Sequence, residues 1–100
     1  MKYPKFSVLA QQDLYEIAAY VSADNPSAAA RVINAIEETA VRIAANSRIG
    51  RIVDSATLCD GLRFLPCARF TNFHIYYRTV DEDVVIVRIL HGARDASLLI

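Results

Sequence analysis

The sequence predicts an α+β fold: a short β-strand, an α-helical hairpin and then a three-stranded antiparallel β-meander, with the helices packed on one face of the sheet. Three observations lead to this prediction. Two segments of the first half have apolar residues at helical spacing, a proline separates them, and three later segments are rich in β-branched and aromatic residues. A chain of 100 residues is expected to form a single domain over residues 1–100.

The first half of the chain is predicted to contain the short strand and both helices. Lys5–Ala10 can form the strand, and Gln11–Ala23 has the apolar spacing of a helix. Asn25-Pro26 interrupts this spacing, because a residue before proline avoids the helical conformation. Proline suits the first turn of a helix, so the second helix is predicted over Pro26–Asn46, which is rich in alanine.

The second half is predicted to contain the meander. Arg51–Gly61 is interpreted as an irregular connection that leads into strands at Leu62–Pro66, Phe73–Val80 and Val84–Leu90. The acidic segment Asp81–Asp83 forms the turn between the last two strands. Val84–Leu90 is almost continuously apolar, which is typical of a strand buried on both faces. This strand is therefore expected inside the sheet, next to the first strand and parallel to it.

One arginine interrupts the last predicted strand. Simple alternation places Arg88 on the same face as Val84, Ile86 and Leu90. A guanidinium among apolar neighbours is costly unless it is paired, so a carboxylate or several carbonyl groups should contact Arg88.

The strand runs directly into a corner of polar residues. His91 closes the strand and Gly92 permits a reversal of the chain, so we interpret His91 and Asp95 as structural. For Arg88 and Arg94 an internal ion pair and a contact with a target are both left open.

Two further kinds of residue have simple structural interpretations. His74 lies between apolar residues and is interpreted as a structural histidine with its hydrogen bonds satisfied, not as a ligand. The tyrosines are interpreted as aromatic residues at the edge of the core, apolar in body with a polar tip. These are Tyr15, Tyr20, Tyr76 and Tyr77.

Composition excludes several classes of protein. Lysine plus arginine and aspartate plus glutamate both number 11, so no net charge attracts nucleic acid. Cys59 and Cys67 do not have the spacing of a zinc site, and they are expected to be reduced thiols of a cytosolic protein. No metal or cofactor is expected. The first ten residues are too short and polar for a signal peptide, and no apolar run reaches membrane length.

Six short motifs occur in an order that is similar to a known family. The chain resembles the ParE branch of the RelE/ParE superfamily of toxin–antitoxin modules over nearly its whole length. Ser47 stands where that family usually has a proline, which is a small departure at a helix end. The motifs are Asp13-Leu14-x-x-Ile17-x-x-Tyr20, Asn25-Pro26-x-Ala28-Ala29 with Arg31 following, Arg48-x-Gly50-Arg51, Gly61-Leu62-Arg63, Ile75-x-Tyr77, and Val87-Arg88-Ile89-Leu90-His91-Gly92-x-Arg94-Asp95.

The resemblance implies a cytoplasmic toxin of the RelE/ParE-like fold with a role in plasmid stabilization. Its expected partners are a ParD-like antitoxin, in a hetero-oligomer, and DNA gyrase as the target. No membrane partner and no sequence-specific nucleic-acid binding by the toxin alone are expected. RelE relatives instead cleave mRNA in the ribosome, and this alternative remains open because a fold does not fix a function.

Candidate site residues follow from these two alternatives. For the gyrase inhibitor no catalytic residue is expected. Its target-binding residues are predicted in the apolar C-terminal tail and just before it: Arg94, Leu98, Leu99 and Ile100. Its antitoxin-binding residues are predicted on the helical hairpin, because the chain is unusually apolar for its size. These are Leu14, Ile17, Val21, Arg31 and Ile36.

The nuclease alternative needs an acid or base and cations that hold phosphate. His91 is its acid–base candidate, with Arg63, Arg69 and Arg88 as phosphate ligands. However, the lysine cluster and supporting glutamate of ribosome-dependent relatives are missing, since no lysine follows Lys5.

Overall fold

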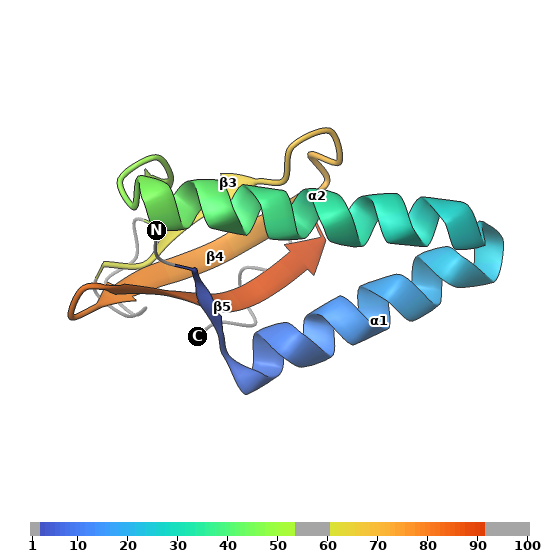
Figure 1. Cartoon of the computed structure of the whole chain (residues 1–100), viewed down its shortest axis with the longest axis horizontal. Helices are drawn as coiled ribbons and strands as arrows, with labels where there is room; N and C mark the ends of the chain where they lie inside the picture. Colours follow the sequence, from blue (N-terminus) through green and yellow to red (C-terminus); the bar gives the residue numbers. More distant parts are fainter. Residues whose placement is uncertain (1–2, 54–60, 92–100) are drawn as a thin grey trace.

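The computed structural model describes residues 3–53 and 61–91, which form an α+β fold with two helices and a five-stranded sheet (Figure 1). The helices pack against each other and cover one face of the sheet, as predicted. In chain order the elements are β1 (Lys5–Phe6), α1 (Val8–Asp24), α2 (Pro26–Ala45), β2 (Arg51–Ile52), β3 (Arg63–Pro66), β4 (Phe73–Val80) and β5 (Asp83–His91).

The strands are ordered β1-β5-β4-β3-β2 across the sheet. β1 pairs parallel with β5, and every other neighbouring pair is antiparallel. The predicted parallel pairing of the first and last strands is therefore confirmed, and β5 lies between β1 and β4. The prediction of an irregular connection from Arg51 was wrong at its start, because β2 pairs there with β3 and adds a fifth strand. Residues 54–60 lie outside the described part of the chain.

The start of α1 also differs from the prediction. β1 ends at Phe6, and Ser7 caps a helix that begins at Val8, so the predicted strand Lys5–Ala10 was too long. The Ser7 hydroxyl accepts a hydrogen bond from the Ala10 backbone N–H at 3.0 Å. Serine is a favoured N-cap residue because it satisfies a backbone donor that the first helical turn leaves free. Ser7 was thus the signal in the sequence that marked this boundary.

Apolar side chains form one cluster on each face of the sheet. The larger cluster lies between the helices and the sheet and includes fully buried Ile36, Ile75, Tyr77 and Ile86. The smaller cluster is formed by buried Leu62, Tyr76 and Leu90, with partly buried Val53, Phe64 and Val87 packed against them. The two faces of the sheet are therefore both apolar in part, but only one carries the helices.

A register shift between β4 and β5 divides the residues of β5 between these clusters. Tyr76 is opposite Arg88 but Tyr77 is opposite Ile86, so Val87 is an extra residue in β5. The extra residue reverses the alternation of side chains beyond it. Arg88 therefore shares a face with Tyr76, and the prediction that it shares the face of Val84 and Ile86 was wrong.

Candidate functional site

The most deeply buried ion pair of the described residues joins α1 to the last strand. Arg88 donates from Nε to Asp13 Oδ2 at 2.8 Å and from Nη2 to Asp13 Oδ1 at 3.0 Å. The two side chains are only 18% and 8% exposed. The Ile89 backbone N–H donates to the same carboxylate at 2.9 Å. Of the two predicted kinds of partner, a carboxylate or several carbonyl groups, Arg88 contacts a carboxylate, and Asp13 is the residue that sequence reasoning missed.

The same carboxylate accepts a backbone hydrogen bond at the edge of β5 that β1 leaves unpaired. β1 pairs with β5 only as far as Ile86, and the Ser7 backbone N–H donates to the Ile86 carbonyl at 2.9 Å. The Ser7 hydroxyl then donates to the Val87 carbonyl at 2.7 Å. With the Ile89 N–H bound to Asp13, side chains at the start of α1 take the place of a longer β1. This arrangement fixes α1 to the edge of β5.

A second polar network holds the segment that follows α2. The Gly50 backbone N–H donates to Tyr77 Oη at 2.8 Å, and Tyr77 Oη donates to the Ser47 carbonyl at 2.9 Å. Arg63 Nη1 donates to the Gly50 carbonyl at 2.9 Å. A Cβ at Gly50 would lie 2.7 Å from Tyr77 Cε1. Burial raises the pKa of the Tyr77 hydroxyl. Arg63 thus has a structural role in this network.

The four residues considered for a nuclease site each have separate contacts. Arg63 on β3 and Arg88 on β5 belong to the two networks just described. Arg69, between β3 and β4, pairs with Glu38 of α2 at 3.1 Å on the surface. The His91 ring packs edge-on against Phe73, with ring centroids 5.3 Å apart. None of these contacts joins one candidate to another in the described part of the chain.

The predicted antitoxin-binding residues differ in accessibility. Ile36 is fully buried in the core of the chain itself, so the prediction that it contacts a partner was wrong. Leu14, Ile17 and Val21 are partly buried against the same core. Arg31 is exposed on α2. Helical spacing identifies an apolar stripe, but the stripe cannot reveal whether the partner is the protein's own sheet or another chain.

The outer side of α1 presents large apolar side chains to solvent. Tyr15 and Tyr20 are 80% and 82% exposed, so their interpretation as residues at the core edge was wrong. Val8 and Leu9 in the first turn are 70% and 52% exposed. We refer to these four residues as the α1 apolar face. The sequence indicated this face, because these apolar residues of α1 lie outside the stripe of Leu14, Ile17 and Val21 that packs on the core.

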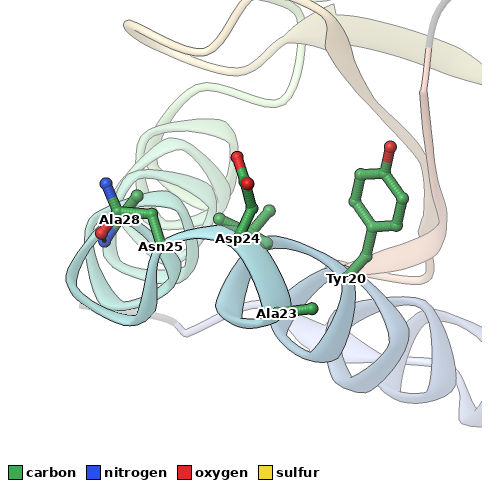
Figure 2. A pocket seen from close by; sticks show the side chains of 6 residues that line it. Tyr20, Ala23, Asp24, Asn25 and Ala28 are labelled. Carbon is green, nitrogen blue, oxygen red and sulfur yellow. Dashed lines mark hydrogen bonds between the residues drawn. The ribbon is translucent and has the colours of Figure 1, made fainter.

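An open hollow of about 720 Å³ lies where α1 passes into α2 (Figure 2). The side chains of Tyr20 and Asp24 point to the same side of α1 there. The lining residues are Tyr20, Val21, Ala23, Asp24, Asn25 and Ala28. None of them is basic.

His74 lies on the sheet face opposite the helices. Its ring stacks on Phe64 with centroids 5.2 Å apart. The buried Nδ1 atom has no hydrogen-bond partner among residues 3–53 and 61–91, so the interpretation of a fully satisfied histidine was wrong.

Other predicted features give no site in the described segments. Cys67 is fully buried, and burial raises the pKa of its thiol. Residues 3–53 and 61–91 contain no group of three or more histidine, cysteine or acidic side chains that could hold a metal ion. In the same segments no helix is long and apolar enough to cross a membrane. Predicted residues that lie outside the described part of the chain are Cys59, Gly92, Arg94, Asp95, Leu98, Leu99 and Ile100.

Comparison with known protein families and solved structures identifies the class of protein to which this chain belongs. Residues 5–96 match the family described as the ParE toxin of the type II toxin–antitoxin system parDE. The chain therefore belongs to the ParE toxin family. A solved structure described as the chromosomal ParDE TA system from P. aeruginosa has the same fold, with a TM-score of 0.76 and 22% sequence identity. The match covers 92% of this chain and 97% of that chain. A comparison with curated protein sequences finds no match.

Proposed function

We propose that this toxin inhibits DNA gyrase by binding it and that a ParD-like antitoxin neutralises the toxin. Membership of the ParE family is the observation that carries this proposal. On this proposal the protein acts in the cytoplasm and its effect does not depend on catalysis by its own side chains.

The contacts of the arginines support binding over RNA cleavage. A nuclease of the RelE kind needs its acid–base group and its phosphate ligands around one scissile bond. Here Arg88 is held by Asp13, Arg63 by Gly50 and Arg69 by Glu38. Converting these residues into one phosphate site would require breaking a buried ion pair, which is costly.

The α1 apolar face supports the antitoxin part of the proposal. It combines large exposed side chains, including Tyr15 and Tyr20, with a helix that is itself firmly fixed to β5. Exposed apolar patches of this kind mark protein interaction sites. An antitoxin segment that folds on binding would cover this face and the helical hairpin. Arg31 lies outside the face, so Arg31→Glu should weaken the complex only about twofold to fivefold, as is usual for a charge at the rim.

Inducible expression in bacteria without the antitoxin tests the target. Chromosome integrity and mRNA integrity are followed in the same cultures, and purified toxin is added to a gyrase supercoiling assay. We expect stalled replication, damaged chromosomes and inhibited supercoiling while transcripts stay intact. Rapid transcript cleavage with intact chromosomes would overturn the gyrase proposal in favour of the ribonuclease.

The C-terminal tail gives a second test. Deletion of residues 96–100 should abolish toxicity and leave antitoxin binding largely intact, if Leu98, Leu99 and Ile100 contact the target. If the tail instead packs on the sheet, exposing each leucine would cost about 1.5–3 kcal/mol, and both activities would fall through unfolding. Melting curves of the truncated protein separate the two cases. A destabilised variant that has lost both activities contradicts the targeting role.

A further inference from the structure

The tip of the helical hairpin extends beyond the sheet (Figure 1). The hollow lined by Tyr20, Asp24 and Ala28 lies at this tip, where α1 ends and α2 begins. Val21 and Ala28, which also line it, are only partly buried. The tip therefore offers an apolar surface that neither β4 nor β5 covers in the described part of the chain.

The end of α1 carries negative charge that no basic side chain of its own last turn offsets. The last turn of α1 contains no basic residue, and Asp24 is its final residue. A helix C-terminus carries a partial negative charge that normally favours a cation. The Asp24 carboxylate has no ion pair and no hydrogen bond within residues 3–53 and 61–91. The N-terminus of α2 begins two residues later and offsets the α1 terminus, so the Asp24 carboxylate is the charge that remains for a cation.

Tyr20 supplies the second half of a cation site. It precedes Asp24 by four residues, so both side chains lie on one side of α1, as Figure 2 shows. Tyr20 is 82% exposed although it lines the hollow beside Val21 and Ala23. The face of a tyrosine ring attracts ammonium and guanidinium groups. Asn25 also lines the hollow, but its side-chain oxygen already accepts a hydrogen bond from the Ala28 N–H as the cap of α2.

We propose that this hollow receives a lysine or arginine side chain of the antitoxin. The cation lies over the Tyr20 ring and pairs with Asp24, and the alkyl part of the side chain packs on Val21 and Ala28. This inference rests on the proposed neutralisation by an antitoxin and names the chemistry of one contact. An anionic side chain would be repelled by Asp24, and an apolar one would bury that carboxylate without a partner. A long basic side chain can pair its charge with Asp24 and also pack its alkyl part on the apolar residues of the hollow.

Two substitutions and two matched controls test the proposal. Tyr20→Ala and Asp24→Asn change the hollow, whereas Tyr3→Ala and Asp81→Asn change a tyrosine and an aspartate that are also exposed but do not line it. The Kd of each purified variant for the antitoxin encoded beside it is measured by calorimetry at two salt concentrations. Melting temperatures confirm that each variant is folded.

Both hollow variants should bind the antitoxin about tenfold more weakly, and the controls should stay within about twofold of the parent protein. Asp24→Asn should also reduce the salt dependence of binding. Asp24→Lys should bind more weakly still, and a glutamate in place of one basic residue of the antitoxin should restore binding to it.

The outcomes distinguish this inference from the proposed function. If the parent toxin does not bind the antitoxin, the proposed neutralisation itself fails. If the parent binds and both hollow variants bind as tightly as the controls, the cation site is overturned and the proposed function stands. The inference also fails if no basic residue of the antitoxin, replaced by glutamate, restores binding to Asp24→Lys.

Discussion

Removing the guanidinium of Arg88 should destabilise the fold strongly. In Arg88→Ala the Asp13 carboxylate, whose side chain is 8% exposed, keeps the Ile89 N–H as its hydrogen-bond donor within residues 3–53 and 61–91. Breaking a buried ion pair by removing one partner costs about 3–5 kcal/mol. The whole domain is expected to be stable by only about 5–15 kcal/mol. For a chain of this size each kcal/mol corresponds to about 4–8 °C in Tm, so Tm should fall by at least about 12 °C.

A double-mutant cycle measures the coupling directly. Urea unfolding is followed for the parent, Arg88→Ala, Asp13→Ala and the variant with both changes. Each single change removes one half of the Asp13–Arg88 ion pair and leaves the other charge buried, whereas the double change removes both charges. The double variant should therefore lose less stability than the two single variants together, with a coupling energy of at least about 1.5 kcal/mol. Lys5→Ala is the control, since its ion pair with Asp83 is exposed and should contribute less than about 1 kcal/mol.

A coupling energy below about 0.5 kcal/mol would refute this reasoning, because the two residues would then act independently. An Arg88→Ala variant that keeps the parent Tm but has lost toxicity would refute it in another way. That result would mean that Arg88 contacts the target and that its pair with Asp13 contributes little to stability.

Two further predictions concern the other polar network and the buried thiol. Gly50→Ala should cost about 1–3 kcal/mol in urea unfolding, because the new Cβ would lie 2.7 Å from Tyr77 Cε1 and 2.8 Å from the Phe64 carbonyl oxygen; an unchanged urea midpoint would contradict this. Alkaline pH should destabilise the fold, because burial raises the pKa of Cys67 above its ordinary 9.0 and that of Tyr77 above its ordinary 10.0. The unfolded chain loses these protons first, so stability is complete below about pH 9 and falls as pH rises through the raised values. Cys67→Ala should remove the part of this loss that begins near pH 9, and an unfolding free energy that stays constant to pH 11 would contradict the prediction.

The elements that the sequence determined by itself depend on neighbours close in the chain. Pro26 and the alanines after it define α2, which runs over Pro26–Ala45 with Asn25 as its N-cap. The alternation in Phe73–Val80 predicted β4 with the observed bounds. That Arg88 needs a buried partner was also predictable, since a guanidinium among apolar residues requires a carboxylate or several carbonyl groups. These inferences hold because helix capping, proline geometry and side-chain alternation act within a few residues.

Only the tertiary structure decided which groups far apart in the chain meet. Asp13 and Arg88 are 75 residues apart, and no local pattern selects this carboxylate from the eleven acidic residues. β2 contains two residues, too few for any periodicity, and it is a strand only because β3 lies beside it. The extra residue Val87 in β5 is visible only against the register of β4. Ile36 fills the core because the sheet lies opposite α2. Each of these features depends on hydrogen bonds and burial that exist once distant segments are packed together, so the residues alone do not specify them.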